Sequence, residues 1–361
     1  MKEIDIFDNF YKDKRVLITG HTGFKGSWLS IWLNELGAKV IGIGLEPYSE
    51  RDNFVLSGIG TKIQADIRDD IRNGARMIEI FKAYQPEIVF HLAAQPLVRL
   101  SYDIPVDTYD TNVMGTIHIM EAIRATKSVK VGVMITTDKC YDNKEQKKGY
   151  VETDPFGGYD PYSSSKGACE IAIQSWRRSY FNPKDYGKTH FVSLASVRAG
   201  NVIGGGDWAL DRIIPDCIRA LEANKDIDIR SPKAIRPWEH VLEPLSGYLT
   251  LAKAMWQYPT EYCEGWNFGP EAESVSTVWE VATALIEDFG FGKLKSSSDP
   301  NAVHEAELLM LNITKAKERL DWKPRMNMQQ CIALVADWYK RYKSEDVYQL
   351  CIEEIEQFLS Y

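Results

Sequence analysis

A glycine-rich turn separates a short apolar strand from an amphipathic helix near the start of the chain. The apolar run covers residues 15–19, the turn reads Gly20-His21-Thr22-Gly23-Phe24-Lys25-Gly26, and apolar residues at helical spacing follow over 27–36. Gly37 then has the position of a helix C-cap. Glycine backbone angles permit the turn and let a pyrophosphate approach closely, and the helix start supplies free N–H groups and a positive dipole end. The turn therefore predicts a dinucleotide-binding site.

Strand and helix patterns continue to alternate through the first half of the chain. Strand-like apolar runs occur at 39–45, 62–65, 87–92, 129–136 and 191–197, and helical patterns at 108–125 and 162–180. This alternation implies right-handed crossover connections and a parallel sheet covered on both faces. We therefore predict an α/β fold in which residues 1–200 form a Rossmann-type, doubly wound dinucleotide-binding domain.

The pattern changes after residue 200. Residues 204–207 are typical of a loop, helical patterns then dominate, and only short strand-like pieces remain at 227–229 and 266–268. Thr277 and Glu280 have the spacing of a capping box that opens a helix through Ile286. We predict that residues 201–361 form mainly a smaller, mixed α/β substrate-binding domain, and that a segment at about 237–260 returns to the first domain.

Composition limits the partners of this protein. The net charge of −8 disfavours binding to nucleic acid or to anionic membranes through bulk charge. No run approaches the ~18 apolar residues of a membrane span, and residues 1–5 lack the apolar core of a signal peptide. The six cysteines and six histidines show no metal-ligand spacing. We expect a cytoplasmic protein with free thiols and without a metal, a nucleic-acid partner or a membrane partner.

A Tyr-x-x-x-Lys pair lies on the helix predicted at 162–180. Tyr162 and Lys166 are one helical turn apart and so share a face. A phenol with a pKa of ~10 is a poor base at neutral pH, but a nearby ammonium group and a nicotinamide cation favour the phenolate. The pair follows a strand that ends in hydroxyl residues, Thr136 and Thr137. This order indicates a tyrosine base beside a nicotinamide cofactor.

These motifs together resemble the extended short-chain dehydrogenase/reductase family over about residues 12–325. The resemblance implies a bound NAD. The matching positions are Gly20, His21, Gly23, Phe24, Lys25, Gly26, Asp66, Ile67, Leu92, Ala93, Ala94, Gln95, Thr111, Tyr162 and Lys166. The family often has an acidic residue at the end of the second strand to bind the adenosine ribose. Here that position falls near Gly44, with Glu46 two residues on, which leaves the choice between NAD and NADP open.

The residues after Thr137 indicate the reaction within that family. Epimerases and reductases usually lack an acid–base pair there, whereas nucleotide-sugar 4,6-dehydratases have one, and this chain has Asp138-Lys139. Oxidation at C4 of the sugar makes H5 acidic, so loss of water across C5–C6 needs a base for H5 and an acid for the C6 hydroxyl before hydride returns to C6. We therefore predict a 4,6-dehydratase, with a C4 epimerase, a reductase or a non-enzymatic dinucleotide-binding regulator as alternatives.

The resemblance also implies a role for each residue of this group. Thr137 binds the C4 hydroxyl, and Tyr162 with Lys166 removes its proton. Asp138 is the acid and Lys139 the base for H5. The positions that match the family's substrate-binding residues are Asn201, Arg212, Arg236 and Asn267. The planar fork of an arginine suits a diphosphate. Segments 20–26, 136–141 and 198–208 most resemble the branch that acts on CDP-glucose, although no residue here reads cytosine by its type or spacing.

Two predicted helices carry more apolar residues than the single face that would pack against the sheet. These residues are Val113, Ile117, Ile119 and Ile123 on the first helix, and Ile171, Ile173 and Trp176 on the second. Surplus apolar surface on paired helices favours packing against another copy of the chain, as family resemblance also implies. We therefore expect a homodimer or a homotetramer.

Overall fold

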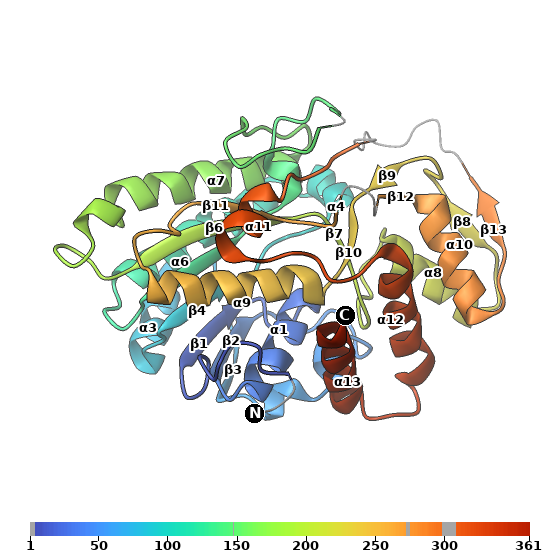
Figure 1. The fold of residues 1–361 in the computed structure, drawn as a ribbon, viewed down its shortest axis with the longest axis horizontal. Helices are drawn as coiled ribbons and strands as arrows, with labels where there is room; N and C mark the ends of the chain where they lie inside the picture. Colours follow the sequence, from blue (N-terminus) through green and yellow to red (C-terminus); the bar gives the residue numbers. More distant parts are fainter. Residues whose placement is uncertain (1–3, 147, 272–274, 298–307) are drawn as a thin grey trace.

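A parallel sheet of seven strands lies at the centre of the protein in the computed structural model, which describes residues 4–146, 148–271, 275–297 and 308–361 (Figure 1). The strand order is β11-β6-β5-β4-β1-β2-β3. The strands are β1 (Arg15–Thr19), β2 (Lys39–Gly44), β3 (Ala65–Arg68), β4 (Ile88–His91), β5 (Val131–Ile135), β6 (Ser193–Ala199) and β11 (Gly265–Phe268). The predicted doubly wound fold is confirmed. Residues 1–3, on which the expectation about a signal peptide partly rests, lie outside the described residues.

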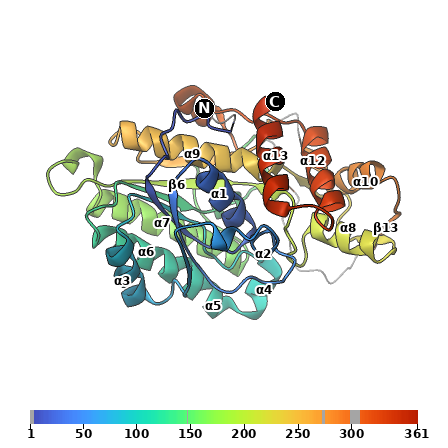
Figure 2. The same ribbon diagram turned by 90° about the horizontal axis from the view of Figure 1, so that it is seen from below.

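Helices cover both faces of this sheet (Figure 2). One face carries α1 (Phe24–Glu35) and α9 (Leu242–Gln257), and the other carries α3 (Gly74–Tyr84), α6 (Gly115–Arg124) and α7 (Pro161–Ser179). Alternate residues of β1 enter different cores: Val16 and Ile18 pack with α1 and α9, whereas Leu17 packs with α3 and α6. Because both faces are buried, the strands read as continuous apolar runs instead of alternating ones.

Two segments after residue 200 contribute to the large sheet. We expected the strand near Trp266 to belong to the smaller domain, but β11 pairs with β6 and forms an edge of the central sheet. Helix α9 packs on β5 and β6, and its Tyr248 and Leu249 are fully buried. Burial of Trp266 and Phe268 accompanies the pairing of β11 with β6, which places this strand in the large sheet.

Most of the remaining elements gather at one end of the sheet, whereas α11 (Thr314–Leu320) packs against β11 and α9, and α13 (Val347–Ser360) packs against α1 (Figure 1). Three short pairs of strands are β7 (Asn201–Ile203) with β10 (Trp238–His240), β8 (Ile227–Ile229) with β13 (Leu294–Ser296), and β9 (Ile235–Arg236) with β12 (Ser276–Thr277). The helices are α8 (Ile213–Glu222), α10 (Val278–Phe289), α11 (Thr314–Leu320), α12 (Met328–Arg341) and α13 (Val347–Ser360). The predicted capping box is confirmed, because the Thr277 hydroxyl accepts from the Glu280 amide at 3.2 Å and the Glu280 carboxylate accepts from the Thr277 amide at 2.7 Å.

Two predicted elements differ from the structure. The strand expected at 62–65 begins only at Ala65, because the chain before it is still turning: the Ile63 amide donates to the Ile59 carbonyl. The helix expected at 108–125 is a succession of α5 (Pro105–Tyr109), a π-helical turn η2 (Asp110–Met114) and α6. Three short elements precede these: α2 (Asn53–Leu56), the 3-10 turn η1 (Ile59–Thr61) and α4 (Val98–Asp103). The π turn lies beside the site described below, as is frequent for such turns.

The apolar surplus on the two helices is smaller than expected. Ile119, Ile123 and Ile173 are fully buried in the core beneath α6 and α7, and Val113, Ile117 and Trp176 pack against that core. Ile171 remains exposed, at 60%. Further exposed apolar side chains lie on α4, α5 and η2, namely Leu100, Tyr102, Val106, Tyr109 and Met114. Three of the seven predicted residues therefore belong to the core, because the sheet covers them, whereas the other four keep some exposed surface.

All six cysteines are buried as free thiols. Of the helices in the described ranges, none has both the length and the apolar character that crossing a bilayer requires.

Candidate active site

A cleft of about 1540 Å³ opens at the carboxyl ends of the central strands. The glycine-rich turn, the ends of β2, β4 and β5, and the start of α7 form one side. The other side comes from β7, α8 and the segment before β9. Ligands of open α/β sheets bind in this position, where loops from neighbouring strands diverge.

The glycine-rich turn packs too closely for side chains at two of its glycines. Gly20 has a φ of +74°, and a Cβ there would lie 2.8 Å from the Ala93 Cα. A Cβ on Gly26 would lie 2.0 Å from the Gly20 carbonyl oxygen. Helix α1 begins directly after Gly23, and no described side chain caps it. Its first N–H groups therefore face the cleft, so the turn fits the pyrophosphate of a dinucleotide.

Most of the predicted cofactor residues reach the cleft. The ones that line it are Gly20, Gly23, Phe24, Lys25, Gly26, Leu92, Ala93, Ala94, Thr111, Tyr162 and Lys166. His21, Asp66, Ile67 and Gln95 do not appear on its wall among the described residues. The Gln95 side chain points into the protein, where its Nε2 donates to the Thr108 hydroxyl at 2.9 Å.

His21 and Thr22 pack against Gly44, the position at the end of the second strand where the family often has an acidic residue. The His21 ring is fully buried, and its Nε2 lies 2.7 Å from the Asp66 Oδ1, which also accepts from Arg68 at 2.6 Å. Burial lowers the pKa of His21 in spite of the neighbouring Asp66. A Cβ on Gly44 would lie 2.9 Å from the Thr22 Oγ1 and 3.1 Å from the His21 Nδ1. The Thr22 and His21 side chains thus occupy the space that an acidic side chain there would need, and Glu46 lines the cleft nearby.

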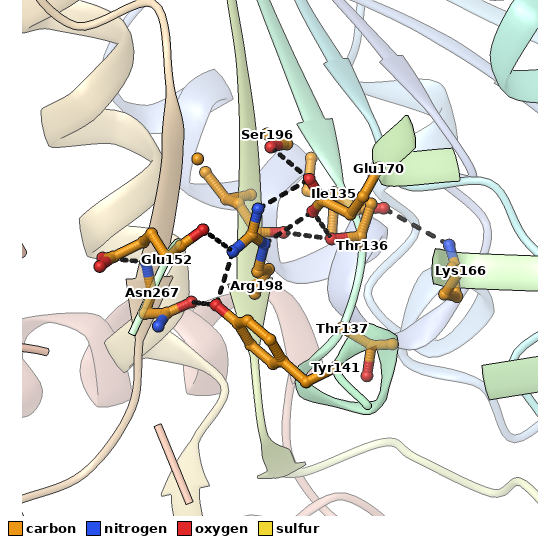
Figure 3. A network of polar contacts seen from close by, with 12 residues as sticks. Ile135, Thr136, Thr137, Tyr141, Glu152, Lys166, Glu170, Ser196, Arg198 and Asn267 are labelled. Carbon is orange, nitrogen blue, oxygen red and sulfur yellow. Dashed lines mark hydrogen bonds and ion pairs between the residues drawn. The ribbon is translucent and has the colours of Figure 1, made fainter. Parts of the chain in front are cut away.

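Tyr162 and Lys166, in the first turns of α7, lie near Thr137, which follows the end of β5. Tyr162 is almost fully buried and hydrogen-bonds to the Thr137 side chain. The Lys166 Nζ donates to the Ile135 carbonyl at 3.4 Å, at the end of β5 (Figure 3). Burial raises the pKa of Tyr162, and the cation that opposes this shift is Arg212.

Asp138 and Lys139 lie on η3, a 3-10 turn (Asp138–Cys140) that directly follows Thr137. Lys139 lines the cleft, and its Nζ lies 3.6 Å from the Asp138 Oδ1. The Asp138 carboxylate is fully buried, and its Oδ1 accepts from the Thr137 hydroxyl at 2.8 Å. Its Oδ2 has no hydrogen-bond partner in the described part of the chain. The lysine thus faces the cleft directly, whereas the carboxylate lies one layer behind Thr137.

Three of the four predicted substrate residues line the cleft, namely Asn201, Arg212 and Arg236. The Asn201 Oδ1 is buried and unpartnered within the described residues. The Arg212 Nη1 donates to the Asp207 carboxylate at 2.8 Å, and the charge of Asp207 raises the pKa of Arg212. These residues offer an amide and two guanidinium groups to an anionic ligand.

Asn267 was predicted to face the nucleotide, and this prediction is wrong. Its side chain is fully buried: the Oδ1 accepts from the Tyr141 hydroxyl at 2.8 Å, and the Nδ2 donates to the Tyr150 carbonyl at 2.9 Å. The amide therefore joins β11 to the loop that follows β5. Spacing alone placed Asn267 near the site, but the direction of its side chain depends on this tertiary contact.

A buried acid beside the cleft was missed. Glu239 on β10 is almost fully buried, and neither carboxylate oxygen has a hydrogen-bond partner in the ranges described. Burial raises its pKa. Burial also lowers the pKa of Lys25 to about 8, with the charge of Glu239 opposing that shift. Glu239 follows the predicted Arg236 by three residues, and this proximity was the only signal in the sequence.

Comparisons with known proteins agree with this geometry. The model of the GDP-mannose 4,6 dehydratase family matches residues 17–335. The CDP-glucose 4,6-dehydratase of Salmonella typhimurium is 46% identical over 353 residues, which cover 98% of each chain. This chain belongs to the nucleotide-sugar 4,6-dehydratase family. The resemblance inferred from the motifs is thereby confirmed.

Solved structures share the fold of this 4,6-dehydratase family member. The UDP-glucose 4-epimerase of Thermus thermophilus, in complex with NAD, has a TM-score of 0.77 and 22% identity over 91% of this chain and 99% of that one. The dTDP-glucose 4,6-dehydratase of Bacillus anthracis, in complex with NAD, has a TM-score of 0.75 and 21% identity, over 93% and 99% of the two chains.

Proposed function

We propose that this protein is an NAD-dependent CDP-glucose 4,6-dehydratase, which converts CDP-glucose to CDP-4-keto-6-deoxyglucose. The observation that carries the proposal is that one cleft unites a dinucleotide cradle, the Tyr162–Thr137 pair and the Lys139 amine. An epimerase or a reductase needs no acid–base pair beside that tyrosine. The identity of 46% over 98% of the chain to a CDP-glucose 4,6-dehydratase supports the substrate.

The cradle and the strand ends would hold NAD. Gly20, Gly23 and Gly26 allow the backbone to contact the pyrophosphate, and the small residues Ala93 and Ala94 let the dinucleotide lie against the sheet. Bound NAD supplies the hydride acceptor at C4 and the hydride donor at C6, and its positive ring opposes the effect of burial on the pKa of Tyr162. Arg212 and Arg236 would bind the diphosphate of the sugar nucleotide.

Two sets of side chains divide the chemistry. In the oxidation, Tyr162 removes the proton of the C4 hydroxyl while Thr137 holds that hydroxyl in place. In the elimination, Lys139 takes H5. Asp138 supplies, through the Thr137 hydroxyl that contacts it, the proton with which the C6 hydroxyl leaves as water as the C5–C6 double bond forms. Lys139 then returns a proton to C5 when hydride reaches C6. The proton that Tyr162 gains offsets the one that Asp138 gives up. Because the hydride removed at C4 returns at C6, the cycle is redox-neutral and leaves no reduced cofactor.

Turnover with CDP-, UDP-, GDP- and dTDP-glucose, compared side by side, tests the assignment. We expect a 4-keto-6-deoxy sugar from CDP-glucose at a kcat/KM well above the other three, over many turnovers and without accumulation of NADH. Product identity is read by NMR. Stoichiometric NADH release would indicate a simple dehydrogenase, and a galacto-configured product would indicate an epimerase.

Replacement of Lys139 by Met separates the two half-reactions. The substitution keeps the stem and removes the amine, so C4 oxidation should persist while overall turnover falls ~10²–10⁴-fold, as expected for loss of a general base. In a single turnover, reduced cofactor should accumulate with absorbance at about 340 nm. Lys144→Met is the matched control, because Lys144 also pairs with an aspartate near the cleft mouth, Asp142.

The same variant has outcomes that contradict the assignment. Exchange of H5 with heavy water at the wild-type rate would remove Lys139 from the role of base. Absence of any reduced cofactor would show that Lys139 is needed for binding or for the first step.

We also propose a homo-oligomer, a dimer or a tetramer, that forms through the exposed apolar residues of α4 to α7. Val106 is 80% exposed and Ile171 60% exposed, which is unusual for side chains of this type on neighbouring helices. Light scattering at micromolar concentration should show a dimer or a tetramer, and a monomer would contradict the proposed oligomer.

We also place the protein in the cytoplasm, where a reducing environment suits six buried free thiols.

A further inference from the structure

A buried ion pair contacts Thr136 and Tyr141, two residues that line the cleft (Figure 3). Glu170 of α7 and Arg198 of β6 form two parallel hydrogen bonds: Arg198 Nε to Glu170 Oε1 at 2.9 Å, and Arg198 Nη2 to Glu170 Oε2 at 2.9 Å. Both side chains are almost fully buried. Burial alone would raise the pKa of Glu170, but the charge and hydrogen bonds of Arg198 hold that pKa below its ordinary value. The pair is therefore charged, planar and fixed in orientation.

Glu170 fixes the helix that carries Tyr162 and Lys166. It lies one turn beyond Lys166 on α7, and its two oxygens accept from the Thr136 hydroxyl at 2.5 Å and from the Ser196 hydroxyl at 2.8 Å. Thr136 immediately precedes Thr137 at the end of β5. The carboxylate thus joins α7 to the ends of β5 and β6, and it sets the position of Tyr162 relative to Thr137.

Arg198 reaches the other part of the site through Tyr141. Its Nη1 donates to the Tyr141 hydroxyl at 2.5 Å, and that hydroxyl donates to the Asn267 Oδ1 at 2.8 Å. Tyr141 directly follows η3, the turn that bears Asp138 and Lys139, and its amide donates to the Asp138 carbonyl. Burial raises the pKa of Tyr141, so it stays a neutral phenol that transmits position and does not take a proton.

The helix and the turn are also in direct contact. A Cβ on Gly167 would lie 2.5 Å from the Gly157 carbonyl oxygen and 3.3 Å from the Cys140 carbonyl oxygen. Gly167 lies one residue after Lys166, and Cys140 one residue after Lys139. The two segments with the reactive side chains therefore pack backbone to backbone.

We propose that Glu170, Arg198 and Tyr141 are positioning residues that hold the C4 oxidation pair and the C5–C6 elimination pair in one fixed arrangement. The inference rests on the proposed function. Glu170 sets the oxidation side and Tyr141 the elimination side, and Arg198 joins them. Desolvation of a buried ion pair offsets much of its attraction, so the pair contributes orientation more than stability. A sugar that must react first at C4 and then at C5 and C6 needs both sets of groups in place at once.

Tyr141→Phe tests this division, with Tyr150→Phe as the matched control. Both tyrosines are buried in one cluster with stacked rings 5.2 Å apart, but the Tyr150 hydroxyl bonds to Asn143 and to the Lys144 amide instead of Arg198. Tyr141→Phe should slow formation of the ketosugar roughly 10- to 100-fold through kcat, the scale of a small misplacement. KM and the rate of C4 oxidation should be unchanged, and NADH should build up transiently. Tyr150→Phe should keep wild-type kinetics.

Three results would overturn the inference. Wild-type kinetics of Tyr141→Phe would show that its hydroxyl does not position the turn. Equal slowing in both variants, together with equal losses of thermal stability, would assign the effect to packing. Equal slowing of oxidation and elimination in Tyr141→Phe would remove the separation of roles. These results differ from a failure of the proposed function itself. In that case the wild-type enzyme would form no ketosugar from CDP-glucose.

Discussion

The paired contact between Glu170 and Arg198 links helix α7 to strand β6 and, through Tyr141, to the turn after β5. In the low-dielectric interior such a contact is strong only when every polar partner is satisfied, and here Thr136, Ser196 and Tyr141 supply those partners. Each of the three comes from a segment that ends at the cleft. We therefore infer that the orientation of the reactive side chains depends on a contact between two residues that do not line the cleft.

The sheet determines where this contact can have chemical consequences. All seven strands are parallel, and helices pack through apolar side chains on both faces of the sheet. Neither face is therefore open to a ligand. The cleft opens beyond the carboxyl ends of the strands, where loops diverge. The dinucleotide cradle after β1 and the turn after β5 open into the same space. The smaller elements, from β7 to α8, cover it from the other side and add Arg212 beside Asp207.

Local signals in the sequence predicted well what depends on local geometry. The glycine turn, the helix with Tyr162 and Lys166, and the capping box at Thr277 are each fixed by backbone angles or by spacing within one element. Side-chain direction was harder, since it depends on segments far apart in the chain. Asn267 turns toward Tyr141, and Asp138 lies behind Thr137. The role of Glu170 could not be predicted for the same reason. In the sequence it is an acidic residue on a helix like several others, and only the tertiary fold brings Arg198 next to it.

In the proposed reaction, one site oxidises C4 and reduces C6 without releasing the intermediate. CDP-glucose deuterated at C4 tests this most directly, by mass spectrometry and NMR of the product. If Tyr162 and Lys139 act within one cleft, the deuterium lost from C4 should appear on the C6 methyl group of the same molecule. A mixture of labelled and unlabelled substrate should give no crossover between molecules. A methyl group without deuterium, or label scrambled between molecules, would contradict the proposal, because hydride would then leave the cleft between the two half-reactions.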